Sequence, residues 1–270
     1  MMTRRTLIAA AAGVAAAGAA QAQDGKAKAA DARELAARIP GLKLTGREQI
    51  AMLLYPGFTA LDFAGPYHFL GSMPGAKVHL VTNQADLKPV PSDMGMAIQP
   101  TTTMKDCPED LTVLFTPGGT AGTVAAARDP TTVAFMADRA ARAEYVTSVC
   151  SGSLILGAAG VLQGRRATSH WSAVPLLAQF GAIPQRQRVV RDDNVITGAG
   201  VSAGLDFGSA LVAELRGQPF AEAAVLVAEY DPEPPIAGGS IETARPEIRQ
   251  LMEGSLAAFV AEARTLRPLA

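Results

Sequence analysis

The stretch Tyr145-Val-Thr-Ser-Val-Cys150-Ser-Gly-Ser-Leu-Ile-Leu-Gly-Ala-Ala159 decides the fold. A short run rich in β-branched residues stops at Cys150, and an apolar run suited to a buried helix begins three small residues later. A strand that leads directly into a helix needs a sharp turn, and the small residues 151–153 allow it. The arrangement predicts a nucleophile elbow with cysteine in place of serine. We expect the helix N-terminus to lower the thiol pKa, whereas the alternative is a buried structural cysteine.

The remaining pattern predicts an α/β fold. Buried apolar strands are expected at 49–55 and 111–116, and further strands at 77–82 and at the β-branched run 145–149. Helices are expected at 62–70, 130–142, 202–216 and 220–229. Two short extended pieces near 87–90 and 96–99 are also predicted, as are a helix ending near Phe180 and a hairpin that turns at Asp192-Asp193. Uninterrupted apolar strands that alternate with helices indicate a mostly parallel sheet covered on both faces. In such sheets the functional site lies at the carboxyl ends of the strands.

The first 22 residues have the features of an export signal. Arg4-Arg5 precedes an Ala-, Gly- and Val-rich run that reaches Ala20-Gln21-Ala22, a small-x-small cleavage site. The arginine pair favours the twin-arginine route and a periplasmic location. A membrane anchor is the competing interpretation, but an apolar run of about fourteen residues is too short to span a bilayer. The mature chain is therefore expected to have no membrane segment.

The mature chain divides into three parts by composition. Residues 23–47 are polar and form a linker or arm with at most one helix near Asp31–Arg38, and residues 48–230 form the main domain. Residues 231–270 contain a Pro/Gly linker and a single amphipathic helix that begins at Pro246. The formal charge of −1 and the lack of a basic run argue against a nucleic-acid partner. With only two cysteines, we expect both thiols to be free.

Four groups are predicted to meet at the carboxyl edge of the sheet. They are Cys150, the turn containing Gly118 and Gly119, Asp62 and His170. The glycine pair could point backbone N–H groups into the site as an oxyanion hole, or it could be only a tight turn. Asp62 could be a proton shuttle or the N-cap of the following helix. His170 could serve the site or be an ordinary core or surface residue. The three histidines show no metal-ligand spacing, so no metal or cofactor is expected.

In combination these motifs resemble the DJ-1/PfpI superfamily, and within it the isonitrile hydratase (isocyanide hydratase) branch. The resemblance runs from about residue 50 to 230 and is carried by Leu61-Asp-Phe-Ala-Gly-Pro66, Pro117-Gly-Gly119, Thr147-Ser-Val-Cys-Ser-Gly-Ser153 and Ala167-Thr-Ser-His-Trp171. It implies a flavodoxin-like three-layer sandwich with an elbow cysteine and a homodimeric assembly.

The resemblance also implies an activity, the cysteine-dependent hydration of isocyanides to N-substituted formamides. Cys150 would be the nucleophile and Asp62 the proton-transfer acid, and the aspartate at this position favours the hydratase branch over glyoxalase-like relatives. Ser151 would be the third catalytic residue: it stands where the branch commonly has threonine and keeps the hydroxyl donor of that residue. The Gly118, Gly119 and Ser151 N–H groups would hold the developing charge, and His170 would line the pocket around the small-molecule substrate.

Two other functions stay open at this stage. One keeps the fold and nucleophile but acts on small carbonyl compounds, as a glyoxalase- or amidase-like enzyme. The other is a non-catalytic ligand-binding or stress-related module. The family domain also occurs fused to DNA-binding domains, but residues 231–270 are too few for a helix-turn-helix domain, and an export signal excludes a cytoplasmic operator.

Overall fold

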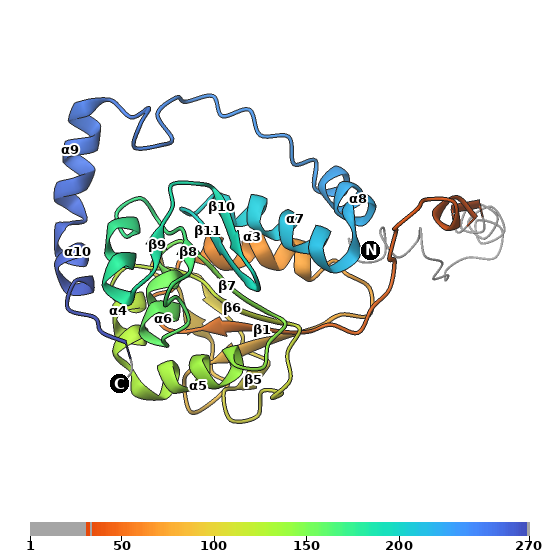
Figure 1. Ribbon diagram of the computed structural model, residues 1–270, viewed down its shortest axis with the longest axis horizontal. Helices are drawn as coiled ribbons and strands as arrows, with labels where there is room; N and C mark the ends of the chain where they lie inside the picture. Colours follow the sequence, from red (N-terminus) through yellow and green to blue (C-terminus); the bar gives the residue numbers. More distant parts are fainter. Residues whose placement is uncertain (1–30, 33, 269–270) are drawn as a thin grey trace. The chain divides into compact units, whose positions relative to one another are not determined.

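The structure, a computed structural model, describes residues 31–32 and 34–268 (Figure 1). These residues divide into two compact units. The larger unit contains Gln49–Gly65, Val78–Phe207 and the chain from Glu233 onward, and it holds most of the sheet. The smaller unit contains the described residues up to Glu48 together with Pro66–Lys77 and Gly208–Pro232. The predicted signal at residues 1–22 lies outside the described residues.

A seven-stranded, mostly parallel sheet forms the centre of the fold. Its strands lie in the order β10-β11-β7-β6-β1-β2-β5, and only the β10–β11 pair is antiparallel among the pairs whose register is defined. The bounds are β1 Gln49–Leu54, β2 Lys77–Thr82, β5 Thr102–Thr103, β6 Val113–Thr116, β7 Tyr145–Val149, β10 Val189–Asp192 and β11 Val195–Gly198. Figure 1 shows β1, β6 and β7 side by side. These central strands are almost entirely buried, which accounts for the mainly apolar sequences of β1 and β6.

Helices cover the two faces of the sheet and complete a three-layer α/β sandwich. The ring of Phe115 in β6 packs against Phe63 of α3 and Phe207 of α7, with ring centroids 6.4 and 5.8 Å away. Helices α4, α5 and α6 pack on one another, and α5 and α6 also contact β6. The helix bounds are α3 Ala60–Leu70, α4 Ala121–Arg128, α5 Pro130–Ala140, α6 Gly152–Ala158, α7 Ala203–Arg216 and α8 Gln218–Ala228. The predicted α/β fold class is confirmed.

Several small elements differ from expectation. The segment before Phe180 is a 3-10 helix, η1 (Val174–Phe180), and α4 was not predicted because its alanine-rich sequence has little apolar periodicity. Two short strand pairs, β3 Val90–Pro91 with β4 Ala97–Ile98 and β8 Arg166–Ala167 with β9 Ile183–Pro184, lie outside the main sheet. The predicted β10–β11 hairpin forms, but it turns at Asp193-Asn194, one residue later than expected, with Asp193 at φ 57°.

The prediction of a single C-terminal helix is wrong. The chain forms α9 (Pro246–Ser255) and α10 (Ala257–Ala263), and the break falls at Leu256, whose backbone has φ −92° and ψ 0°. Gly254 precedes the break and favours it, because glycine weakens a helix. Helix α10 is held by Arg128 of α4, whose Nη2 donates to Glu262 Oε2 at 2.7 Å and to Thr265 Oγ1 at 2.6 Å. No helix within the described ranges is long and apolar enough to cross a membrane.

A buried ion pair fixes the segment that precedes β1. Arg216, 1% exposed, donates from Nε and Nη2 to the two carboxylate oxygens of Glu48, both at 2.6 Å. Its Nη2 also donates to Pro74 O at 2.9 Å. The bidentate geometry and the added carbonyl satisfy a charge that burial would otherwise make costly. In the predicted arm, residues 34–37 are helical.

Candidate active site

Cys150 lies at a strained turn between β7 and α6. Its backbone has φ 58°, a conformation that few residues other than glycine adopt. The backbone around it is fixed, because its N–H donates to Ala199 O at 2.8 Å and its carbonyl accepts from Ser169 Oγ at 2.9 Å. These bonds hold the elbow that the sequence predicts. The side chain is only 6% exposed.

Asp62 approaches the elbow from the first turn of α3 and is fully buried. Its Oδ2 accepts a hydrogen bond from Gly118 N at 3.0 Å, and Oδ1 is buried without a hydrogen-bond partner among the described residues. The helix begins at Ala60 and the carboxylate bonds another loop, so Asp62 is not the N-cap of α3. Burial raises the pKa of Asp62 to about 7. The hydrogen bonds from Cys150 and Gly118 lower this pKa, but their effect is smaller than that of burial.

The environment of the thiol differs from the sequence-based expectation. Burial raises the pKa of Cys150 well above its usual value, and repulsion by the Asp62 carboxylate raises it further. The Ser151 N–H acts in the opposite direction but does not outweigh these effects. The expected lowering of the thiol pKa is therefore wrong, because burial is not visible in the sequence and α6 spans only seven residues. The thiol and the acid titrate as a coupled pair.

Gly118 lies directly against both members of the pair. A Cβ added to Gly118 would lie 2.8 Å from Asp62 Oδ2, 2.8 Å from Cys150 Cβ and 2.6 Å from Ser151 N. The turn therefore requires glycine for space. At the next residue, a Cβ on Gly119 would lie 2.4 Å from the carbonyl oxygen of Gly57. The Pro117–Gly119 turn is thus a close-packed part of the site, which a simple surface turn would not be.

Ser151 uses its hydroxyl to hold this turn. Its Oγ accepts from Gly119 N at 3.0 Å, donates to Gly119 O, and lies 3.1 Å from Thr123 Oγ1. The side chain is 1% exposed. The hydroxyl is therefore committed to the glycine turn, and the Ser151 group that faces Cys150 is its backbone N–H. This geometry makes Ser151 a positioning residue.

Two further residues of the site were not predicted from the sequence. Tyr55 follows β1 and donates from its hydroxyl to Pro117 O at 2.7 Å, and Thr123 of α4 lies 2.9 Å from the same hydroxyl. Both side chains are buried. Tyr55 is the only side chain with a hydroxyl in the first apolar run, at its carboxyl end. That position was the one available signal, because such strand ends face the site.

His170 lies near the elbow segment but is engaged elsewhere. Its Nδ1 lies 2.8 Å from Ser172 Oγ, and its ring packs against Trp171 with centroids 5.2 Å apart. Burial lowers the pKa of His170 to about 4, so the ring is neutral at physiological pH. The neighbouring Ser169 makes the bond to the Cys150 carbonyl. These contacts suit His170 to a wall of the site better than to a base.

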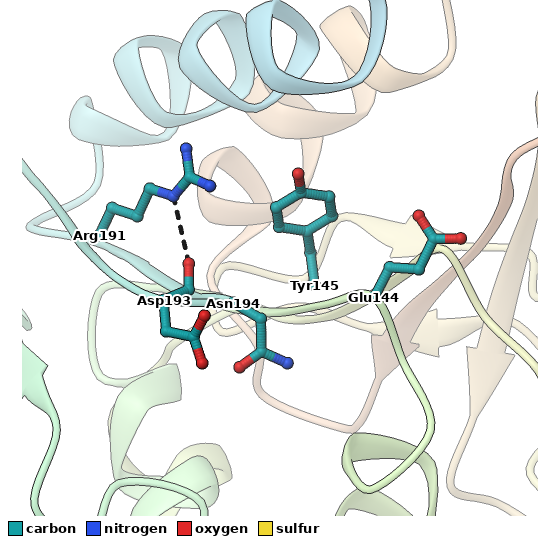
Figure 2. A pocket seen from close by; sticks show the side chains of 5 residues that line it. All are labelled: Glu144, Tyr145, Arg191, Asp193 and Asn194. Carbon is teal, nitrogen blue, oxygen red and sulfur yellow. Dashed lines mark hydrogen bonds between the residues drawn. The ribbon is translucent and has the colours of Figure 1, made fainter.

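A solvent-facing pocket lies at the amino ends of the strands, whereas Cys150 lies at the carboxyl end of β7. Figure 2 shows its lining, which comes from the residues just before and at the start of β7 and from the β10–β11 turn. The lining residues are Glu144, Tyr145, Arg191, Asp193 and Asn194. Because β7 runs from Tyr145 to Val149, the pocket is at the amino end of the strand and Cys150 at its carboxyl end. The pocket is therefore separate from the candidate active site.

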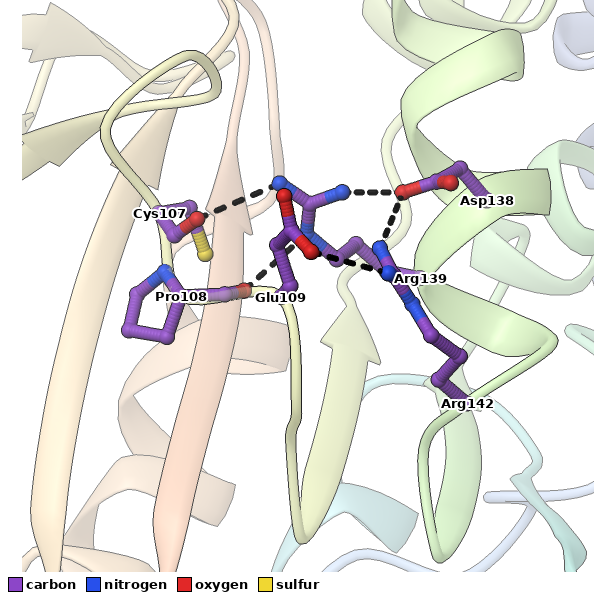
Figure 3. A network of polar contacts seen from close by, with 6 residues as sticks. All are labelled: Cys107, Pro108, Glu109, Asp138, Arg139 and Arg142. Carbon is purple, nitrogen blue, oxygen red and sulfur yellow. Dashed lines mark hydrogen bonds and ion pairs between the residues drawn. The ribbon is translucent and has the colours of Figure 1, made fainter.

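The second cysteine belongs to a structural loop. Cys107 is a free, buried thiol, and its carbonyl accepts from Arg139 Nη2 of α5 at 3.2 Å (Figure 3). Arg139 also bonds Pro108 O, and Arg142 joins the network through Asp138 and Glu109. Burial raises the pKa of the Cys107 thiol, although the positive charge of the nearby Arg139 acts to lower it. The network holds the loop before β6 to α5. Cys150 is also free, as expected.

Comparison with known proteins identifies the family of the chain. Residues 48–214 match the DJ-1/PfpI family. The chain belongs to that family. An isonitrile hydratase from Pseudomonas putida is 50% identical over 196 residues, which cover 73% of this chain and 84% of the relative.

Solved structures of the family agree with this assignment. A ThiJ/PfpI family protein from Pseudomonas syringae is 59% identical, covers 83% of this chain and 92% of its own, and superposes with a TM-score of 0.82. Drosophila melanogaster DJ-1beta, at 21% identity and a TM-score of 0.61, is similar in fold. The predicted family and flavodoxin-like architecture are confirmed.

Proposed function

We propose that this protein hydrates isocyanides to N-substituted formamides, with Cys150 as nucleophile and Asp62 as the proton-transfer group. The observation that carries the proposal is the buried pair itself: a thiol at a strained elbow beside an acid whose pKa burial raises to about 7. A general acid–base with a pKa near the working pH transfers protons efficiently in both directions. The 50% identity to an isonitrile hydratase supports the same substrate class.

In the first step the coupled pair holds one proton, which lies on Cys150 because burial raises the pKa of the thiol above that of the acid. The Asp62 carboxylate takes this proton as the sulfur attacks. Sulfur attacks the terminal carbon of R–N≡C, and a new S–C bond forms as one C–N π bond breaks. Asp62 gives its proton to that carbon. The product is a thioimidate, Cys150–S–CH=N–R, with Asp62 as carboxylate. No leaving group is needed at this stage, because the electron pair of the broken π bond moves onto the isocyanide nitrogen and the proton adds to the lone pair on carbon.

In the second step Asp62 activates water against the thioimidate carbon. The carboxylate takes one proton from water and delivers it to nitrogen, while the hydroxyl adds to carbon. The hydroxyl proton then passes to Asp62 as the C–S bond breaks. This releases R–NH–CHO and restores the pair with its single proton. The orphaned Oδ1 of Asp62 is the free acceptor that this cycle requires.

The backbone groups at the elbow supply the electrostatic part of catalysis. The Ser151 N–H favours negative charge on the Cys150 sulfur. The Gly118 N–H holds Asp62, and Ser151 Oγ occupies the Gly119 N–H, so these glycine donors position the acid and the turn. This role differs from the oxyanion hole expected for the two glycines. We place His170 in the pocket wall.

Product analysis tests the function directly. Purified protein incubated with a small alkyl or aryl isocyanide should yield the N-formyl amine, with ¹⁸O from H₂¹⁸O in the formyl oxygen and deuterium from D₂O at the formyl carbon. Cys150→Ala should abolish this product, whereas Cys107→Ala should not. Turnover of a small dicarbonyl compound with no isocyanide turnover would instead establish the glyoxalase-like alternative.

We also propose that the protein is exported to the periplasm by the twin-arginine route and acts there as a homodimer. The Arg4-Arg5 pair and the Ala20-Gln21-Ala22 site support export. The exposed apolar side chains of α9, among them Leu251 at 64% exposure, are compatible with a subunit contact. Sedimentation equilibrium at micromolar concentration measures the oligomeric state, and a monomer would contradict the second part of the proposal.

A further inference from the structure

Two active-site groups contact the same peptide unit from opposite sides. The Pro117 carbonyl accepts from the Tyr55 hydroxyl at 2.7 Å, and the N–H of the same Pro117–Gly118 peptide donates to Asp62 Oδ2 at 3.0 Å. Thr116 Oγ1 is a second, longer donor to that carbonyl, at 3.3 Å. A carbonyl that accepts a hydrogen bond polarises its peptide, so the N–H at the other end becomes a stronger donor.

The protons of the neighbouring hydroxyls fix the direction of this contact. Tyr55 has one hydroxyl proton, and the Pro117 carbonyl, which can only accept, takes it. The hydroxyl of Ser151 likewise donates its only proton to the Gly119 carbonyl. The contacts of Thr123 with Tyr55 and with Ser151 can therefore be filled only by the single Thr123 proton, which serves one of them at a time. Thr123 can therefore donate either to the Tyr55 oxygen or to Ser151 Oγ.

The geometry points to Tyr55 as a positioning residue that sets the strength of the Gly118 N–H and, through it, the position and proton affinity of the Asp62 carboxylate. This inference rests on the proposed role of Asp62 and assigns a function to a residue outside the recognised motifs. The tyrosine does not contact the reacting atoms. It acts at the far end of one planar peptide.

Other ionisable groups near Asp62 must be held constant in any test. The Cys150 thiol at the elbow interacts with it, and Asp93, in the loop between β3 and β4, adds a weaker repulsion. Asp93 is itself held by Thr59, whose Oγ1 donates to Asp93 Oδ2 at 2.6 Å. Replacing the thiol in every variant removes the coupling to Cys150. Leaving Asp93 and Thr59 unchanged keeps the remaining field the same.

The titration of Asp62 gives a readout that is independent of turnover. In full-length protein carrying Cys150→Ser and ¹³C-labelled aspartate, the carboxyl resonance that titrates near neutral pH is assigned by its loss in Asp62→Asn. Adding Tyr55→Phe weakens the Gly118 N–H donor, so the midpoint should rise by about half a pH unit, the scale of a modest hydrogen-bond change. Tyr145→Phe removes a hydroxyl at the opposite edge of the sheet and should leave the midpoint unchanged.

A second variant keeps the test valid if Tyr55→Phe does not fold. Biosynthetic 3-fluorotyrosine makes each phenol a stronger donor with little change in size, and it should lower the Asp62 midpoint. The expected result is two opposite shifts of the Asp62 titration midpoint: upward in Tyr55→Phe and downward in the 3-fluorotyrosine protein. An unchanged midpoint in folded Tyr55→Phe, or in the fluorinated protein, would overturn the inference. If the shifts appear but no isocyanide is hydrated, the positioning role stands and only the proposed reaction fails.

Discussion

Asp62 and Cys150 both lie directly against Gly118. A Cβ added to this glycine would lie 2.8 Å from Asp62 Oδ2 and 2.8 Å from Cys150 Cβ. The acid comes from α3 and the thiol from the β7–α6 elbow, so two segments distant in sequence meet at one backbone position. The absence of a side chain at this position allows the pair to form. The distance between acid and sulfur is therefore set by the glycine turn as well as by the two side chains.

Gly118→Ala should therefore inactivate the enzyme. The new methyl group would lie closer to Ser151 N, Asp62 Oδ2 and Cys150 Cβ than atoms tolerate, and the backbone N at 2.6 Å cannot move aside as a flexible side chain would. Since misplacement of a reacting group by about 1 Å can cost 100-fold, we expect at least that loss in kcat/KM. Gly254→Ala, where the added atom meets nothing within 4 Å, should retain full activity. Normal turnover by Gly118→Ala would refute the close contact.

Asp62→Asn should separate turnover from thiol reactivity. Asparagine keeps the shape and can still accept from Gly118, but it cannot transfer a proton, so kcat should fall by about 100-fold or more. The same change removes a carboxylate that raises the pKa of Cys150, so iodoacetamide should alkylate this thiol faster at pH 8 than in the wild type. Mass spectrometry of the Cys150 peptide gives the rate, with Cys107 as internal reference. Near-normal turnover would exclude Asp62 as the proton carrier.

The raised pKa of Asp62 also predicts how stability depends on pH. Between the unfolded value of 3.8 and the folded value of about 7, the native state holds more protons than the unfolded state. Stability therefore falls as pH rises through this window, by up to about 4 kcal/mol. Asp62→Asn removes the penalty, so its Tm should exceed that of the wild type at pH 8 and approach it near pH 4. Asp231→Asn, in the exposed linker, should show no such trend in differential scanning calorimetry.

The Glu48–Arg216 pair should contribute strongly to stability. Glu48→Gln leaves the guanidinium of Arg216, 1% exposed, without its charge partner, and breaking a buried pair from one side costs about 3–5 kcal/mol. Urea denaturation should show the loss. The matched change Glu242→Gln breaks an ion pair to Arg186 whose side chains are 57% and 60% exposed, and its midpoint should stay unchanged. Equal urea midpoints for the two variants would mean that the buried Glu48–Arg216 pair contributes no more to stability than the exposed pair.

The export proposal has a direct cellular test. Residues 1–30 fused to a reporter that folds in the cytoplasm should carry it to the periplasm, because the twin-arginine route transports folded proteins. The double change Arg4→Lys with Arg5→Lys should retain the reporter in the cytoplasm, as judged by osmotic-shock fractionation. Export that continues in this double variant would indicate the general secretory route instead.

The sequence was sufficient for the sheet and for the pairing of Asp62 with Cys150, but not for the groups that support this pair. The strand before Cys150 could be recognised by its β-branched residues, and the small residues after it mark the turn. Asp62 could be assigned through the motif around it. Thr123 could not, because it lies in an alanine-rich helix without a clear apolar face, and Tyr55 ends an apolar run in which its hydroxyl gives no indication of a partner.

The thiol pKa was predicted with the wrong sign for a related reason. A helix N-terminus can be inferred from local sequence, whereas the burial of Cys150 and its repulsion by Asp62 depend on segments that meet only in the folded chain. The hydroxyl of Ser151 is a similar case. Its residue type suggested a catalytic donor, but its direction toward Gly119 is a property of the three-dimensional packing.

The near-complete burial of Cys150 has a consequence for which isomer of a substrate can react. An isocyanide carries its electrophilic carbon at the tip of a narrow linear group, whereas in a nitrile the electrophilic carbon lies one atom behind the tip. Because the whole Cys150 residue is only 6% exposed, we expect its sulfur to react best with an electrophilic atom at the end of a narrow group. We expect a nitrile to be neither substrate nor covalent inhibitor when it competes with its isocyanide isomer at equal concentration, while the bulk of R matters little. Burial of the nucleophile would in this way favour substrates whose reactive carbon is the terminal atom.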